Sequence, residues 1–182
     1  MENILLWFLL GYLGWHLLKL ICPIRAKVVV RVNPMQSVLP LPDTVLSAKL
    51  LSKAGLEALF KARFVQITTA YAAGQLQAVR SFMTDTVFQV FQSAVQKRQE
   101  QGQHIDYKLV DFKRVDFVDT DENMRWVDFE TEQINLLKDK EEKVIEGDPM
   151  YLSLVKERWQ FKWDEKLGWV LSAVKNVEAH EA

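Results

Sequence analysis

Residues 60–103 read FKARFVQITTAYAAGQLQAVRSFMTDTVFQVFQSAVQKRQEQGQ, a pattern that predicts two helices, each ended by a glycine. Apolar residues recur at spacings of three and four, which places one stripe along one face of a first helix. Gly74 follows this stripe and can adopt the left-handed conformation that ends a helix. The stripe begins just upstream and consists of Leu56, Phe60, Phe64, Ile67 and Tyr71.

The second helix has its own start, stripe and end. Thr84 or Asp85 can cap its first turn, and Gly102 can end it. Two amphipathic helices joined by a tight connector must share one apolar partner surface. The apolar stripe of this helix consists of Val87, Phe88, Phe91, Ala94 and Val95.

From Tyr107 onward the apolar residues occur in short runs, which predicts strands. Residues 157–163 read ERWQFKW, and this strict alternation is typical of a strand with one wet face. Turn-forming residues separate the runs at 119–123, 138–143, 147–149 and 164–168. Strands joined by short connections favour an antiparallel sheet. The predicted fold class is therefore α+β, with the helices packed on one face of a bent antiparallel sheet.

The order and spacing of these motifs resemble the Tim44-like domain family over roughly residues 45–175. The shared motifs are Phe60-x-x-Arg63-Phe64-x-x-Ile67-x-x-Ala70-Tyr71-x-x-Gly74-x-Leu76, Phe82-Met83-Thr84-Asp85, Gln101-Gly102-Gln103, Glu146-Gly147-Asp148-Pro149, Trp159-x-Phe161-x-Trp163 and Gly168-Trp169. The resemblance implies the cone-shaped fold of the nuclear-transport-factor-two-like superfamily, with helices and sheet around a pocket. The family includes a scaffold subunit of the mitochondrial inner-membrane import motor and bacterial membrane-anchored proteins. The resemblance therefore implies that this protein binds protein partners and membrane lipid.

The N-terminus predicts a membrane anchor. Residues 4–18 read ILLWFLLGYLGWHLL without a formal charge, and Asn3 to Cys22 is about the length that crosses a hydrocarbon core. A cleavable signal peptide is the alternative, but it requires a basic n-region and a small-x-small cleavage site. Glu2 and the sequence around Pro23 fit that pattern poorly. We therefore expect residues 1–24 to form one uncleaved transmembrane helix.

Charge next to the span predicts its orientation. Basic residues beside a span stay on the cytoplasmic side, so the domain should face the cytoplasm of a bacterium or the matrix of a mitochondrion. A single cysteine agrees with a reducing compartment. The prediction is a single-pass inner-membrane protein whose topology is set by Lys19, Arg25, Lys27 and Arg31.

The rest of the chain divides into three parts. Residues 25–42 form a basic linker that contains Pro34, Pro40 and Pro42, and residues 43–176 form the Tim44-like domain. Residues 177–182 form a tail.

The net charge of −1 conceals a charge division. Residues 1–103 carry eleven Lys or Arg and five Asp or Glu, whereas residues 104–182 carry twelve and nineteen. Such polarity can orient a domain on an anionic membrane, although it is also compatible with an ordinary solvated surface. An acidic sheet half argues against nucleic-acid binding. The candidate lipid-facing residues are Lys49, Lys53, Lys61 and Arg63.

The aromatic content suggests an apolar cleft between helix and sheet, suited to an acyl chain or a hydrophobic segment. The alternative is that these rings simply fill the core. The candidate pocket-lining residues are Phe64, Tyr71, Trp126, Trp159, Phe161 and Trp163.

Catalytic motifs are sparse. The three histidines, His16, His104 and His180, do not have metal-ligand spacing, and no phosphate loop or nucleophile elbow occurs. His104 with Asp106 is one candidate acid–base pair, and a loop histidine with satisfied hydrogen bonds is the favoured interpretation of His104. Enzymes of the superfamily use a buried Asp and Tyr, for which Asp106, Tyr107, Asp111, Asp116 and Asp128 are available.

The sequence therefore predicts a non-enzymatic scaffold without metal or cofactor. An accessory subunit of a secretion, translocation or respiratory complex is one alternative, and a small-molecule enzyme of the same superfamily fold is another. The enzyme alternative predicts a titrating Asp or His inside the cone.

Overall fold

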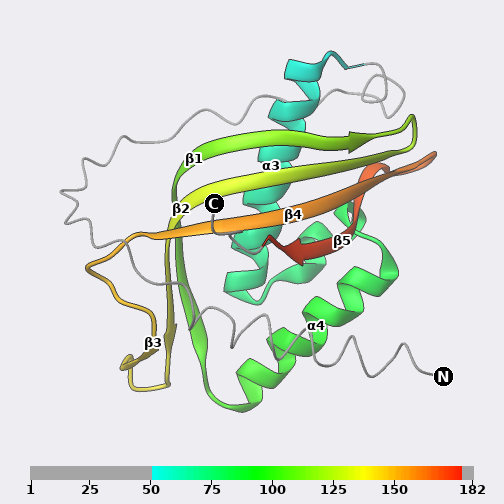
Figure 1. The fold of residues 1–182 in the computed structure, drawn as a ribbon. Coiled ribbons are helices and arrows are strands. Elements are labelled where there is room, and N and C mark those ends of the chain that lie inside the picture. Colours follow the sequence, from blue (N-terminus) through cyan, green and yellow to red (C-terminus); the bar gives the residue numbers. More distant parts are fainter. Residues whose placement is uncertain (1–50, 178–182) are drawn as a thin grey trace.

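A computed structural model describes residues 51–177 of the chain, in which the helices precede the strands (Figure 1). The elements are α3 (Lys53–Ala73), the 3-10 helix η1 (Leu76–Phe82), α4 (Asp85–Glu100), β1 (His104–Thr120), β2 (Met124–Lys138), β3 (Val144–Glu146), β4 (Ser153–Asp164) and β5 (Gly168–Asn176). This arrangement confirms the predicted α+β class. The predicted anchor, the linker and all of the tail after Val177 lie outside the described residues. Within residues 51–177, no helix has the length and apolarity needed to cross a membrane.

Helix α3 forms where the first apolar stripe predicts it. The Ser52 side chain caps its first turn by accepting a hydrogen bond from Gly55 N at 3.2 Å. Gly74 ends the helix with φ of 71°, a left-handed conformation that glycine adopts without steric cost. The predicted stripe is confirmed, because its residues Leu56, Phe60, Phe64 and Ile67 are buried and Tyr71 is half-buried.

Helix α4 begins at the predicted cap, because the Thr84 hydroxyl accepts a hydrogen bond from Val87 N. Val87, Phe88 and Val95 are buried as expected, whereas Ala94 is exposed at the edge of the stripe. The expectation for Ala94 was therefore wrong. One turn later, Arg98 supplies the buried contact instead.

Arg98 joins the two helices. Its Nη2 donates to the carbonyl oxygens of Tyr71, at 2.7 Å, and Ala72, at 3.4 Å, and its guanidinium lies 4.9 Å from the centre of the Tyr71 ring. These carbonyls belong to the last turn of α3, and Tyr71 O also accepts a hydrogen bond from Gly74 N at 3.2 Å. The Arg98 cation adds to this cap and stabilises the negative end of the α3 dipole.

The strands form an open antiparallel sheet in the order β1-β2-β4-β5, with β3 paired to β2. Figure 1 shows that β1 and β2 bend along their length. The register of β1 against β2 shifts at three places, and such bulges increase local twist and curvature. The prediction of a bent antiparallel sheet is therefore confirmed.

The core lies between α3 and one face of the sheet. Phe60 stacks on Phe161 with ring centres 4.2 Å apart and meets Trp169 edge-on at 5.8 Å. Phe64 lies 4.7 Å from Trp159 and 4.8 Å from Phe129. Aromatic pairs at such distances stabilise a core beyond the area that they bury.

Two backbone contacts fix connecting segments against the sheet. Met83 bridges to Leu171 of β5, and Thr84 N donates to Leu171 O at 2.9 Å, which fixes the connector against the sheet edge. Gly147 has φ of 93°, and a Cβ there would lie 2.4 Å from Asn135 O on β2. Only glycine fits this position, which explains the Glu146–Pro149 motif physically.

Candidate functional site

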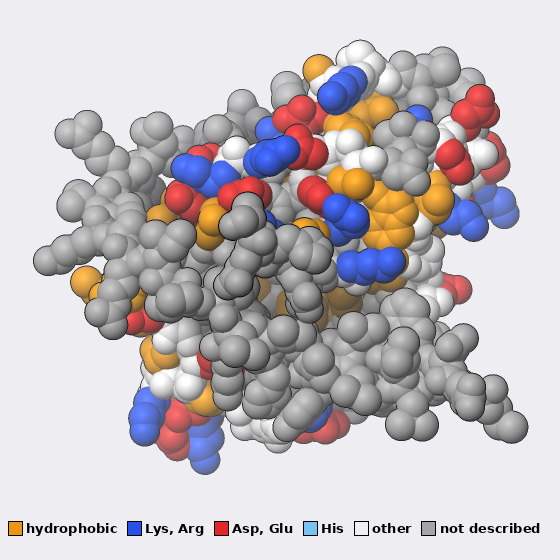
Figure 2. Space-filling view, in the orientation of Figure 1, with side chains coloured by type: hydrophobic (Ala, Val, Ile, Leu, Met, Phe, Trp, Pro, Cys, Tyr) orange, Lys and Arg blue, Asp and Glu red, His pale blue; other side chains and the backbone are white. Residues whose placement is uncertain are grey.

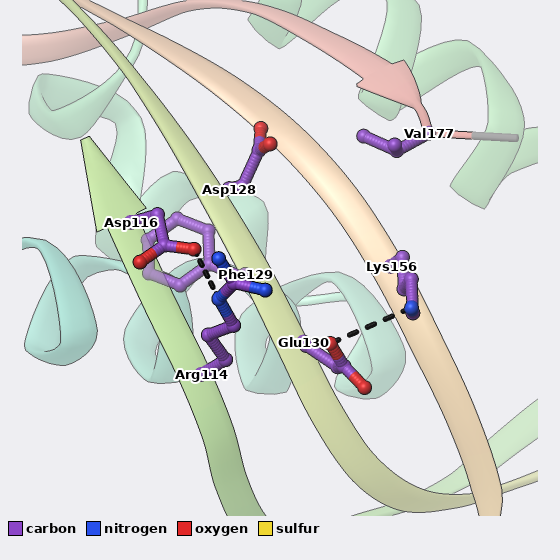
Figure 3. A pocket seen from close by; sticks show the side chains of 7 residues that line it. All are labelled: Arg114, Asp116, Asp128, Phe129, Glu130, Lys156 and Val177. Atoms are coloured by element: carbon purple, nitrogen blue, oxygen red, sulfur yellow. Dashed lines mark ion pairs between the residues drawn. The ribbon is translucent and has the colours of Figure 1, made fainter. Parts of the chain in front are cut away.

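The outer face of the sheet carries a small cavity of about 190 Å³ (Figure 3). Figure 2 shows basic and acidic side chains interspersed on this side of the molecule. The cavity is lined by Arg114 and Asp116 of β1, Asp128, Phe129 and Glu130 of β2, Lys156 of β4, and Val177.

The charges around this cavity neutralise one another. Arg114 pairs with Asp116, and Lys156 Nζ lies 3.6 Å from Glu130 Oε2. Outside the lining, Arg158 binds both carboxylate oxygens of Asp128, at 2.6 and 2.8 Å. Bidentate pairing of this kind is geometrically specific and satisfies both groups. Little unbalanced charge is left for a charged ligand, so this cavity is best understood as a solvated ion-pair ladder.

A larger cleft of about 510 Å³ lies between the end of α3, η1 and α4. Its floor is apolar and consists of Leu76, Phe88 and Val95. Its walls carry Gly74, Ala78 and the glutamines Gln75, Gln77, Gln92, Gln96 and Gln99. None of these lining residues is charged. This cleft was not among the predicted sites, and its one signal in the sequence is the series of glutamines at 92, 96 and 99, which follow one side of α4.

The structure separates the candidate lipid-facing cations. Lys53 is exposed, with Nζ 5.9 Å from the centre of the Phe117 ring, and Lys61 Nζ lies 5.6 Å from that of Phe112. Both therefore lie beside β1. Lys61 also pairs with Glu57 at 2.7 Å, and Lys49 lies outside the described residues.

Arg63 does not lie on the same side of α3 as Lys53 and Lys61. Arg63 is two positions after Lys61, which is about 200° around a helix, so its side chain points toward η1 instead. Its guanidinium lies 3.4 Å from the centre of the Phe82 ring, and its Nε and Nη1 are buried without a hydrogen-bond partner. Burial lowers the pKa of Arg63 to about 10, so the side chain stays charged at neutral pH. The stack on Phe82 partly compensates for the lost hydration.

The six candidate pocket residues do not surround one cavity. Phe64, Trp159, Phe161 and Trp163 are buried in the core between α3 and the sheet. Two others lie elsewhere: Tyr71 packs between the helices against Phe91, and Trp126 lies beneath Lys175 Nζ, 4.8 Å from the ring centre. None of the six lines either cavity described above.

Titratable side chains also lie on the helix-facing side of the sheet, among them Glu157 and Tyr107. Glu157 has the same strand parity as Trp159, and burial raises the pKa of its carboxyl to about 7. Burial likewise raises the pKa of Tyr107 to about 12. Tyr107 Oη and Trp159 Nε1 are themselves buried. The enzyme alternative expected Asp or His here, and the structure places a glutamate.

The proposed acid–base pair of His104 and Asp106 does not form. His104 Nε2 lies 3.3 Å from a carboxylate oxygen of Glu142, and Asp106 binds Lys138 at 2.8 Å. Within the described part of the chain, no three His, Cys, Asp or Glu side chains gather to hold a metal. The topology-setting residues Lys19, Arg25, Lys27 and Arg31 lie outside that part.

Comparison with known proteins identifies the domain. A family model described as the Tim44-like domain matches residues 51–176. A solved structure, the intermembrane space region of the chloroplast protein ARC6, has a similar fold with a TM-score of 0.55 and 15% identity. The similarity covers 70% of this chain and 98% of that one. A comparison with curated proteins finds no match.

Proposed function

The chain belongs to the Tim44-like domain family, and from this membership we propose that it is a non-enzymatic, membrane-anchored interaction protein. Its domain binds a protein partner at an inner membrane and acts as a scaffold or as an accessory subunit of a larger complex. Anionic lipid is a second, weaker ligand of the same domain.

The packed interior is the observation that carries this proposal. The rings between α3 and the sheet lie 4–6 Å apart, so the domain offers its surface rather than an enclosed reaction chamber for recognition. The cleft between α3, η1 and α4 has an apolar floor and uncharged walls, which is a composition suited to protein contacts. The direct test is purification of the full chain from detergent-solubilised membranes, from which a stoichiometric protein partner is expected.

The proposed location follows from the N-terminal sequence. An apolar span at residues 1–24, followed by basic residues, would hold the domain on the cytoplasmic or matrix side of the membrane. A reporter fused after Ala182 should therefore be active only in that compartment. Replacing Arg25, Lys27 and Arg31 with neutral residues should weaken the bias. Reporter activity on the opposite side would refute the orientation.

The proposed lipid contact involves α3. Lys53 and Lys61 lie on the same side of the helix, next to β1, and each cation near an anionic surface contributes ~1 kcal/mol. Lys49 precedes them at helical spacing in the sequence. Arg63 lies on another side and is expected to contribute less, because its charge is held against Phe82.

A further inference from the structure

The cleft between η1 and α4 differs chemically from the outer face of the sheet. Its floor residues Leu76, Phe88 and Val95 are 4%, 7% and 5% exposed, so only a small part of each apolar side chain reaches the cleft. No charged residue lines the cleft, although 26% of the residues in the chain are charged. The outer sheet face, by contrast, is covered by ion pairs.

The walls of the cleft carry free amide groups. Gln96 Nε2 donates to Glu100 Oε1 at 2.9 Å. The structure gives no side-chain hydrogen bond within residues 51–177 for the other four glutamines, all exposed: Gln75, Gln77, Gln92 and Gln99. A glutamine amide offers two donors and an acceptor, which together match the donor and acceptor of a peptide group.

Gly74 makes room for one of these amides. A Cβ at Gly74 would lie 2.9 Å from Gln99 Nε2, so a larger residue would displace the Gln99 side chain. The same glycine ends α3 in a left-handed conformation. The helix end and the wall of the cleft therefore depend on one residue.

Three classes of ligand fit this chemistry poorly. A charged ligand would lose hydration without gaining an opposite charge. A nucleic acid requires Lys or Arg near its phosphates, and none lines the cleft. An acyl chain would cover the wall amides and leave them without hydrogen-bond partners, at a cost of about 1–3 kcal/mol for each buried group.

The dimensions fit a short peptide. The lining residues of α4 run from Phe88 to Gln99, which at about 1.5 Å per residue is roughly 17 Å. An extended chain rises about 3.3 Å per residue, so about five residues would span the cleft.

We propose that this cleft binds a short, extended, uncharged segment of a partner protein. The peptide groups of the segment bond to the glutamine amides, and its apolar side chains rest on Leu76, Phe88 and Val95. This inference rests on the proposed interaction function and names the class of partner segment. The mode differs from strand addition to a sheet edge, because side-chain amides rather than a neighbouring strand receive the peptide.

The test uses the full chain in lipid nanodiscs and a displayed library of random heptapeptides. Enriched peptides should lack Lys, Arg, Asp and Glu at their five central positions. An enriched peptide, measured by fluorescence anisotropy, should bind at least about tenfold more weakly to the double variant Gln92→Ala, Gln99→Ala. Ala78→Trp, which fills the cleft, should have a similar effect. Gln89→Ala is the matched control, because Gln89 is exposed on α4 but does not line the cleft, and its Kd should stay within about twofold.

Three results would overturn the proposal: no enrichment, charged residues at the centre of the enriched peptides, or equal binding by the cleft variants and the control. Co-purification of a partner protein distinguishes a failure of the cleft proposal from a failure of the proposed interaction function. A partner that co-purifies equally with the double variant and with the unaltered chain excludes the cleft but leaves the interaction function standing. If no partner co-purifies, the interaction function itself fails.

Discussion

At the residue scale, Phe64 and Trp159 hold the helix to the sheet. Their rings lie 4.7 Å apart, and each is at most 2% exposed. Phe64→Ala and Trp159→Ala should each lower the free energy of unfolding by about 3–5 kcal/mol, because each change opens a ring-sized cavity. Urea denaturation of the fragment 43–182 measures this. Val90→Ala, at a position that is 45% exposed, is the control and should change stability by less than about 0.5 kcal/mol. A loss below about 1 kcal/mol at either ring would contradict the packing.

Glu157 should make the stability of the domain depend on pH. Its pKa is raised by burial from 4.5 to about 7, so the folded state binds its proton more tightly than the unfolded state. The contribution of Glu157 to the free energy of unfolding should therefore be most favourable below about pH 4.5. It should become less favourable as the pH rises to about 7 and stay constant at higher pH.

Glu157→Gln should remove this contribution and stabilise the domain at pH 8 by roughly 1–3 kcal/mol. One pKa unit corresponds to about 1.4 kcal/mol, and the side chain is only half-buried, so the effect should fall below the full shift. Urea midpoints from pH 4.5 to pH 8 for both proteins provide the measurement. Parallel pH profiles for the two would show that this carboxyl ionises normally.

The inner position of Glu157 was predictable, and that of Arg98 was not. Strict alternation in ERWQFKW places Glu157 on the same face as Trp159, so the sequence contained the information. Arg98 is buried because it reaches the end of another helix, which no local pattern indicates. Local periodicity predicts which face a residue occupies, and tertiary contact decides what it meets there.

At the element scale, β-bulges explain why the apolar residues of β1 do not follow the strand period of two. Along β1, the apolar residues Leu109, Phe112 and Val115 are three apart, which departs from the period of two. The register shifts between Leu109 and Asp111 and between Phe112 and Arg114 account for each extra residue. The turns at 119–123, 138–143 and 164–168 were predicted correctly, because they contain strong turn-forming residues.

Helix α3 is the element on which the proposed lipid contact depends. The fragment 43–182 should bind liposomes that contain anionic lipid at about 50 mM salt and should lose most of this binding near 200 mM, since salt screens such attraction. Lys53→Gln with Lys61→Gln should weaken binding by about tenfold. Flotation with neutral and anionic vesicles provides the measurement. Lys162→Gln with Lys166→Gln, in β4 and the β4–β5 turn, is the matched control for loss of two charges at a different place. Equal binding to neutral vesicles, or indifference to salt, would show that the cations of α3 are ordinary solvated side chains.

At the scale of the whole molecule, the candidate cleft could not be predicted from the sequence. Its walls come from η1 and α4, and the short 3-10 helix has no periodic signature. The aromatic residues, in contrast, were recognisable as one set, but their count alone could not distinguish a lined pocket from a filled core. The structure places Phe64, Trp159 and Phe161 in the filled core.

Co-purification is the direct test of the proposal that this Tim44-like domain binds a protein partner at a membrane. The full chain, tagged after Ala182, is purified from detergent-solubilised membranes and its companions are quantified by mass spectrometry. A matched purification of Trp159→Ala, in which the core is disrupted, controls for capture by the detergent micelle and the N-terminal span. We expect one or more proteins at near one-to-one ratio with the unaltered chain and a several-fold loss of these proteins with Trp159→Ala. Recovery of the chain alone, or of the same proteins at equal yield with the disrupted domain, would contradict it.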